Sequence, residues 1–164
     1  MPLNRHRRRK QLVGYALLEA LVAVIVTSVG FIAAARLQTL GLTFNNSALY
    51  RQKATLLGTQ MTDRMRANQK GMFAGAYNKP APGDTACLAT GCTPAALARA
   101  DMAEWAADVA AQLPDGKGVV CIDSTPDDGT ADAPACDDTG QLLAVKVWWS
   151  DTLGSSRFFT VARP

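Results

Sequence analysis

Histidine is almost missing from this chain, since His6 is the only one among 164 residues. Aromatic residues are also few, at 7%, and charged residues make up only 19% of the sequence. Histidine is the side chain most often used in acid–base catalysis and the commonest metal ligand. The composition therefore disfavours histidine-based enzymes and histidine-rich metal sites, and the sequence indicates no cofactor and no small-molecule substrate.

Basic residues are scarce outside one short stretch. Five of the 17 lie in the first ten positions, at Arg5, Arg7, Arg8, Arg9 and Lys10. Without these five, twelve basic residues face fourteen acidic ones, so the rest of the chain carries a net charge of −2. A nucleic-acid-binding domain normally spreads basic residues over a folded face. We therefore expect no nucleic-acid partner.

A long apolar run follows the basic stretch. Residues 20–35 contain no charged side chain, and residues 15–35 contain only Glu19. A helix over residues 15–35 is about 32 Å long, close to the thickness of the hydrocarbon core of a bilayer. With the basic stretch before the run and only Arg36 close behind it, the positive-inside rule predicts a cytoplasmic N-terminus. A plain single-pass membrane anchor accounts for all of these features.

Glu19 is the residue that a plain anchor does not need. A carboxylate inside a membrane helix is unfavourable unless it is paired or reaches the interface. Glu19 lies four positions after Tyr15, and cleavage after Gly14 would give Tyr15 a free α-amino group. That cation could pair with Glu19 of the same helix or of an adjacent one, which would fix the axial register of the helices. The alternative is a carboxylate that only complements the helix dipole.

The residues around this junction resemble the class III signal of type IV pilins. The basic leader is followed by Gly14, Tyr15, Ala16, two leucines and Glu19, with Tyr15 and Ala16 in place of the usual phenylalanine and threonine. The resemblance implies that a prepilin peptidase cleaves between Gly14 and Tyr15 and methylates the new amino group of Tyr15. It also implies that Glu19 registers one subunit against its neighbour. The apolar helix would leave the inner membrane and pack in a filament core.

The helix is expected to run from about residue 15 to residue 68, with residues 41–47 as the place where it could bend. Its second half has one apolar face with helical spacing, which ordinary core packing explains. The residues of this face are Tyr50, Ala54, Leu57, Met61 and Met65.

Residues 63–68, with the sequence DRMRAN, resemble the end of this helix in one branch of the minor pilins, the type IV pilus modification proteins of the PilV branch. In that branch a cysteine-containing loop, a helix with a tryptophan and a small sheet follow. Asn68 and Gly71 are expected to end the helix. Arg64 and Arg66 suit a solvated helix C-terminus better than an anion site.

The remaining chain predicts a loop, a second helix and three strands. The loop covers residues 71–91, and the helix starts at Pro94 with Thr93 as its cap and Trp105 on its buried face. Asp101, Glu104 and Asp108 are expected mostly on the outer side of this helix.

The strands are expected at residues 118–123, 142–149 and 157–162, in meander order and packed on the long helix, with a turn at residues 154–156. Trp148 and Trp149 must point to opposite faces. One is expected in the core, and the other either contacts a neighbouring subunit or is covered by a loop.

Four cysteines predict two disulfides in an extracytoplasmic body, and the sequence allows three pairings. We favour Cys87–Cys92 and Cys121–Cys136, because each pair is local and connects a Gly/Pro-rich loop to an adjacent element. Closing a loop of about fifteen residues contributes roughly 3 kcal/mol in the chain-entropy model. Zinc is the alternative, but the intervals between the cysteines do not resemble a zinc ribbon or finger.

Residues 124–140 form an acidic loop that contains Asp127, Asp128, Asp132, Asp137 and Asp138 and follows directly after Asp123. Calcium binding is one interpretation, but the ligand order of an EF-hand is missing. We therefore expect a solvated loop.

The resemblance implies an α+β, type IV pilin-like fold with three parts: a cleaved leader (1–14), a transmembrane and assembly segment (15–40), and an amphipathic half-helix with a periplasmic head (41–164). It implies a minor pilin that primes or assembles the type IV pilus with other minor pilins and a tip adhesin, and that supports piliation, twitching motility and adhesion. The protein would lie in the inner membrane and then in the pilus at the cell surface.

Two other function classes stay open at this point. A minor pseudopilin of a type II secretion system shares the leader, Glu19 and the long helix. An anchored periplasmic enzyme is the third class, for which the sequence shows no nucleophile–base pair and no metal constellation. We favour the minor pilin because of residues 63–68 and the order of Cys87, Cys92 and Trp105.

Overall fold

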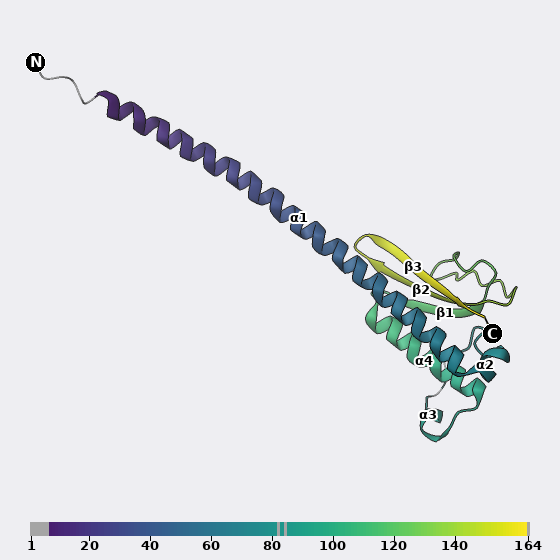
Figure 1. The fold of residues 1–164 in the computed structure, drawn as a ribbon. Helices are drawn as coiled ribbons and strands as arrows, with labels where there is room; N and C mark the ends of the chain where they lie inside the picture. The colour runs from purple at the N-terminus through teal and green to yellow at the C-terminus, as the bar shows by residue number, and fades with distance from the viewer. Residues whose placement is uncertain (1–6, 82, 84, 164) are drawn as a thin grey trace, which may run out of the picture. The chain divides into compact units, whose positions relative to one another are not determined.

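The computed structural model describes residues 7–81, 83 and 85–163, and for residues 7–14 it describes only the helical backbone. In chain order the elements are α1 (Arg7–Ala67), α2 (Gln69–Phe73), α3 (Cys87–Thr90), α4 (Pro94–Gln112), β1 (Lys117–Ile122), β2 (Leu143–Asp151) and β3 (Gly154–Ala162) (Figure 1). The chain divides into two compact units, Met1–Phe44 and Asn45–Pro164, and we call the second unit the head. The predicted α+β class, with a long N-terminal helix and a small antiparallel sheet, is confirmed.

Helix α1 is longer and more regular than expected. The helix continues without interruption through residues 41–47. An exposed glycine such as Gly41 costs a helix only about 1 kcal/mol relative to alanine, which does not break a helix of this length. Asn68 ends α1 and caps α2, because its Oδ1 accepts a hydrogen bond from the Gly71 N–H at 3.2 Å.

The segment predicted as a loop at residues 71–91 is partly helical, since α2 reaches into it and α3 lies within it. Helix α4 follows, and the predicted cap is confirmed: the Thr93 hydroxyl accepts a hydrogen bond from the Ala96 N–H at 3.2 Å. Both short helices are local turns held by a cap or a disulfide, which explains why they carry no periodic apolar signal.

The three strands form one antiparallel sheet in the order β1-β2-β3, as the meander predicts. Val145 in the central strand lies opposite Val120 and Thr160. The turn between β2 and β3 comes earlier than expected, because Asp151 already pairs with Gly154 and Ser155 and Ser156 belong to the ladder. Gly154 has a φ of 118°, a conformation that favours glycine. The turn lies immediately before this residue, between Asp151 and Gly154.

One face of the sheet packs against α1 and α4 and forms the core of the head (Figure 1). Four predicted residues of α1 are buried there, each at most 1% exposed. They are Ala54, Leu57, Met61 and Met65. From α4, Trp105 reaches into the same core, and its indole N–H donates a hydrogen bond to the carbonyl oxygen of Leu57 at 2.9 Å. Helix and sheet are therefore held by both apolar contact and one buried hydrogen bond.

Gly58 allows β3 to approach α1 closely. A Cβ atom at this position would lie 2.6 Å from Cε1 of Phe158. We predict that Gly58→Leu destabilises the head by about 1–3 kcal/mol, since the added side chain overpacks this contact. Denaturant unfolding of the full chain in detergent, followed by tryptophan fluorescence, measures the change.

Gly41→Ala is the matched control, because a Cβ atom at Gly41 meets nothing within 4 Å. Its unfolding midpoint for the head is expected to equal that of the wild-type chain. Equal midpoints for Gly58→Leu and Gly41→Ala would contradict the close approach of β3 to α1.

Candidate assembly helix and the polar contacts of the head

The first half of α1 presents apolar side chains to its surroundings on every side. All residues from 15 to 42 are exposed, including Tyr15 at 78% and Leu37 at 70%. Among the described residues, one helix is long and apolar enough to cross a membrane, and it is this one. Such a surface is stable in lipid or against other apolar helices, but not in water.

Hydroxyl groups in this segment do not interrupt its apolar character. Thr27 donates a hydrogen bond to the carbonyl oxygen of Ala23 at 2.7 Å, and Ser28 donates to that of Ile25 at 2.8 Å. Thr39 likewise donates to the carbonyl oxygen of Ala35 at 3.1 Å. The hydroxyl hydrogens of these three residues are therefore satisfied within the helix itself, which is what a helix needs when its surroundings offer no water.

Tyr15 and Glu19 lie one helical turn apart on this segment. Both side chains are exposed, and no described side chain pairs with Glu19. The predicted leader falls largely outside the described residues: residues 1–6 are not described, and residues 7–14, with Gly14, are described only as helical backbone. Cleavage after Gly14, methylation of Tyr15 and the assembly role of Glu19 therefore stay predictions.

The head contains two disulfides, Cys87–Cys92 and Cys121–Cys136. These are the two local pairings that the sequence favours. The first closes α3 onto the start of α4, and the second connects β1 to the acidic loop. The Sγ atoms of Cys121 and Cys136 lie near the Asp123 carboxylate, within 4.8 Å, but both sulfurs are bonded to each other and offer no thiolate for a metal.

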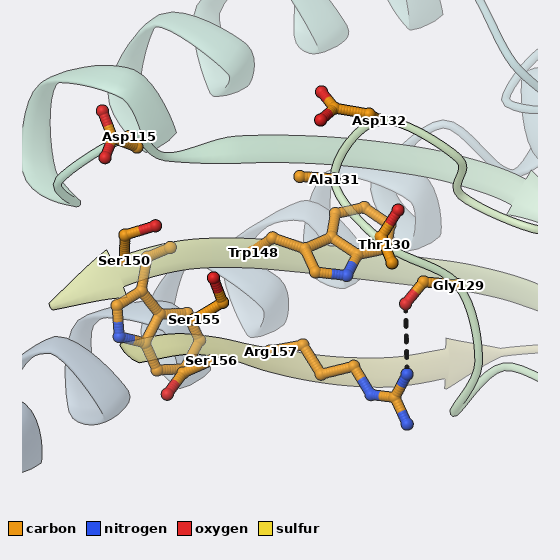
Figure 2. A pocket seen from close by; sticks show the side chains of 11 residues that line it. Asp115, Gly129, Thr130, Ala131, Asp132, Trp148, Ser150, Ser155, Ser156 and Arg157 are labelled. Carbon is orange, nitrogen blue, oxygen red and sulfur yellow. Dashed lines mark hydrogen bonds between the residues drawn. The ribbon is translucent and has the colours of Figure 1, made fainter. Parts of the chain in front are cut away.

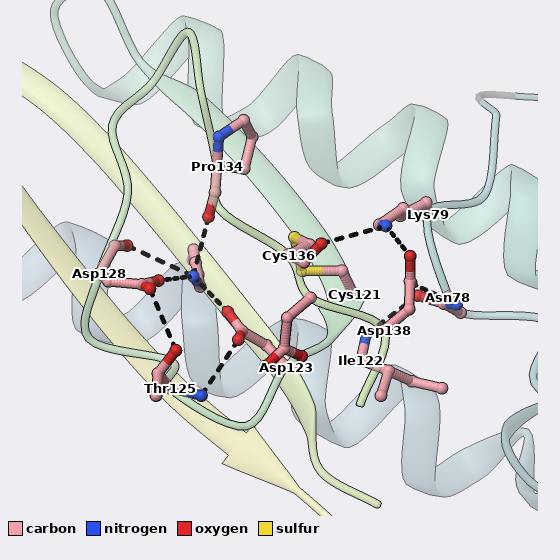
Figure 3. The surroundings of a disulfide bond; sticks show 12 residues. Asn78, Lys79, Cys121, Ile122, Asp123, Thr125, Asp128, Pro134, Cys136 and Asp138 are labelled. Atoms are coloured by element: carbon pink, nitrogen blue, oxygen red, sulfur yellow. Dashed lines mark hydrogen bonds and ion pairs between the residues drawn. A yellow bond between two sulfur atoms is a disulfide. The ribbon is translucent and has the colours of Figure 1, made fainter. Parts of the chain in front are cut away.

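The acidic loop, residues 124–140, covers the face of the sheet that is turned away from α1 (Figure 3). Lys146 of β2 projects from this face and is 2% exposed. Its Nζ forms an ion pair with the buried carboxylate of Asp123 and a second one with Asp128 at 2.8 Å, and it donates to the carbonyl oxygen of Pro134 at 2.8 Å. One buried ammonium group thus binds Asp123, directly after β1, and two residues of the loop, Asp128 and Pro134.

None of residues 124–140 is buried, in agreement with the expected solvated loop, but the loop is held to the head by ion pairs that the sequence did not reveal. Asp123, which precedes the loop, is fully buried, and three lysines from other parts of the chain pair with aspartates of residues 123–140. Lys146 pairs with Asp123 and Asp128, Lys117 pairs with Asp132 at 2.6 Å, and Lys79 pairs with Asp138 at 2.5 Å. Only Lys146 among these lysines is buried, and its ammonium group needs the carboxylates of Asp123 and Asp128 for charge neutralisation.

Burial by itself would lower the pKa of Lys146, but hydrogen bonds to Asp123 and Asp128 outweigh burial and raise it. The hydrogen bond from Lys146 lowers the pKa of Asp128. A raised lysine pKa means that the contact stabilises the folded head below about pH 10 and is lost at higher pH. A lowered aspartate pKa means that the contact is present above about pH 4 and is lost as the pH falls further.

A second polar cluster joins the end of α1 to α4. Arg64 pairs with Glu104 at 2.7 Å and with Asp101 at 3.4 Å, and the Tyr77 hydroxyl donates to the other oxygen of Asp101 at 2.5 Å. Asn68 donates to the Tyr77 hydroxyl oxygen at 3.2 Å. Burial, and next the bond to Asp101, raise the pKa of Tyr77.

The expected outward position of Asp101 is therefore wrong. This carboxylate is only 7% exposed, because it bridges a tyrosine and an arginine from two other parts of the chain. Arg64 is likewise not a solvated helix end but a half-buried contact to α4. Helical spacing places a residue on a face, and it gives no information about a polar partner that buries it.

Both tryptophans of β2 are buried, Trp149 in the core and Trp148 under the acidic loop. The sequence left two options for the tryptophan outside the core, contact with a neighbouring subunit or cover by a loop. In the structure, the loop covers Trp148. A cleft of about 410 Å³ lies beside Trp148, between the loop and the β2–β3 hairpin (Figure 2). Arg157 closes one side through a hydrogen bond to the carbonyl oxygen of Gly129 at 3.2 Å. Within the described ranges, no serine of the cleft is hydrogen-bonded to a basic side chain.

Comparison with protein-family models, with curated proteins and with solved structures gives no match for this chain. The exposed apolar helix with its lone carboxylate is therefore the feature from which a function is inferred.

Removal of the buried lysine tests the role of the acidic loop in the head. Lys146→Met leaves the fully buried Asp123 carboxylate without its cation, and we expect a loss of about 3–5 kcal/mol in the free energy of unfolding. Urea unfolding is followed by tryptophan fluorescence, which reports on the head because all three tryptophans lie there.

Lys117→Met serves as the control, because it removes a lysine–aspartate pair that is exposed to solvent. Its midpoint is expected to stay close to that of the wild-type chain. If Lys146→Met unfolds at the same urea concentration as Lys117→Met, the buried contact does not stabilise the head.

Proposed function

We propose that this chain is a minor pilin that takes part in priming and assembly of the type IV pilus, within a complex of minor pilins at the filament tip. The observation that carries the proposal is the exposed apolar segment of α1, which has a single carboxylate one helical turn after a glycine–tyrosine junction. Its partners would be other minor pilins, a tip adhesin and a prepilin peptidase.

The exposed helix supports a change of surroundings during the life of the protein. The side chains of residues 15–42 find no cover within the chain, so lipid or other subunits must cover them. Glu19 is unfavourable in lipid without a partner. An α-amino group at Tyr15 supplies a cation at the right distance along a helix, and a pair between neighbouring helices sets their axial register.

The head supports a role outside the cytoplasm. All four cysteines form disulfides, which persist in oxidising compartments such as the bacterial periplasm. Among the described residues the head contacts are structural, since its buried charges are used to hold the acidic loop and the end of α1. A small, disulfide-bonded head that follows an apolar helix suits recognition between subunits.

A minor pseudopilin of a type II secretion system remains the alternative. It would use the same junction, the same carboxylate and the same apolar helix, so neither helix nor head separates the two systems. Deletion of the gene separates them, because one system builds surface pili and the other exports proteins.

Gly14→Val tests the cleavage site. A peptidase that accepts only the smallest residue at this position should fail on the variant, so the leader should remain attached. Intact-mass spectrometry of membrane-extracted protein is expected to find a wild-type chain that begins at a methylated Tyr15 and a variant that keeps residues 1–14. A variant chain that still begins at Tyr15 would contradict the proposed junction.

A deletion strain tests the pilus role, and complementation with Glu19→Ala tests the carboxylate. Deletion should reduce surface pili and twitching motility, and the wild-type gene should restore both. Glu19→Ala should be cleaved normally but should fail to restore piliation, because the amine has lost its counter-charge. Ser28→Ala is the matched control, since this exposed hydroxyl bonds only within its own helix. Normal pili with impaired secretion in the deletion strain would favour the pseudopilin.

A further inference from the structure

Arg36 is the only charged residue between Ala20 and Tyr50, and it lies within the exposed apolar surface of α1. No described side chain pairs with it. An arginine keeps its proton at every pH of interest, so it cannot become neutral when it is buried. Its positive charge therefore needs either water, a lipid phosphate or a carboxylate.

The apolar surface extends well beyond Arg36. Leu37, Leu40, Leu42 and Phe44 follow it, and each has about half or more of its side chain exposed. From residue 15 to residue 44 the helix is about 45 Å long, whereas the hydrocarbon core is about 30 Å thick. A usual tilt of about 20° shortens the helix by only a few ångströms. The hydrocarbon core alone therefore does not cover this surface, and the part around and beyond Arg36 lies at the depth of the lipid headgroups. Once the helix has left the bilayer, protein must cover that part.

Arg36 continues a row of large aliphatic side chains with the spacing of a helix–helix contact. The row has alternating steps of four and three residues, and all its members are exposed. They are Leu18, Val22, Ile25, Val29 and Ile32. The next position in the row is Arg36. A single polar residue in such a row specifies the register and the choice of partner helix, at a cost in stability.

Charge balance indicates what the partner must supply. Glu19 is the only carboxylate from residue 15 to residue 50, and it lies seventeen residues from Arg36, about 26 Å along the helix axis. In the proposed function Glu19 also neutralises an α-amino group. A second copy at the same depth therefore brings no carboxylate to Arg36, and the anion has to come from a subunit with a different sequence.

We propose that Arg36 forms an ion pair with an acidic side chain in the apolar helix of a neighbouring, different subunit. This inference rests on the proposed function. In the bilayer, Arg36 lies about 32 Å from Tyr15 and reaches the phosphates of the outer leaflet. When the helix leaves the bilayer, Arg36 loses these phosphates, and the carboxylate of the neighbouring helix replaces them.

The test isolates the full chain in detergent from its own cells together with the pilin-like subunits that co-purify with it, and quantifies each subunit per chain by mass spectrometry. Arg36→Gln and Arg36→Glu should lower the recovery of one subunit about tenfold or more, because a buried carboxylate is left unpaired. Arg36→Lys should retain most of it. Exchange of the acidic residue in that subunit for lysine should restore binding to Arg36→Glu but not to the wild-type chain.

Gln38→Glu is the matched control, because it adds a carboxylate at nearly the same depth but on the opposite side of the helix. Its recovery should equal that of the wild-type chain. Unchanged recovery with Arg36→Gln, or an equal loss with Gln38→Glu, overturns this inference alone and leaves Arg36 with lipid phosphates. A wild-type chain that recovers none of these subunits contradicts the proposed function as well.

Discussion

One helix with two different surfaces is the constraint on which this protein depends. Residues 15–42 of α1 are exposed on all sides, whereas residues 54–65 bury a single face against α4 and the sheet. The first surface is stable only in lipid or protein, and the second is covered within the chain. The head is therefore a compact unit with its own core, while the apolar part of α1 depends on whatever surrounds it.

In the head, the face of the sheet that is turned away from the helices must also be covered. A three-stranded sheet that packs against helices on one side leaves its other side uncovered, and β2 is buried on both sides. A segment without regular structure covers it here, and such a segment has few apolar residues to contribute. Lys146 and the disulfide Cys121–Cys136 supply what the loop lacks, one through charge and hydrogen bonds and the other through a covalent bond. Polar and covalent contacts thus replace a second apolar core.

Sequence reasoning predicted the features that repeat along the chain. The long helix, its buried face and the meander follow from periodic spacing, and the Thr93 cap follows from one local motif. It missed the contacts of Asp101 and Asp123, because each is buried by a partner more than twenty residues away. One signal was present: Lys146 interrupts an apolar run, residues 142–149, that ends in two tryptophans, and a lysine at such a position needs acidic neighbours. The junction at Gly14 and Tyr15 is predicted from the resemblance, and the structure adds only that the Tyr15 side chain is exposed.

The two charged residues of the apolar segment, Glu19 and Arg36, need different partners. Glu19 can be neutralised by a group that cleavage of the same chain creates, so a complex in which every subunit carries this pair is electrically balanced. Arg36 adds one positive charge that no such pair cancels. A balanced assembly must then contain a subunit with one carboxylate more than its own amine requires. An uncompensated charge in a low-dielectric contact is unfavourable by more than a single surface contact can offset. In the proposed assembly the chain would therefore select its neighbours by charge, and it would be placed once, beside one kind of partner, rather than repeated along a shaft.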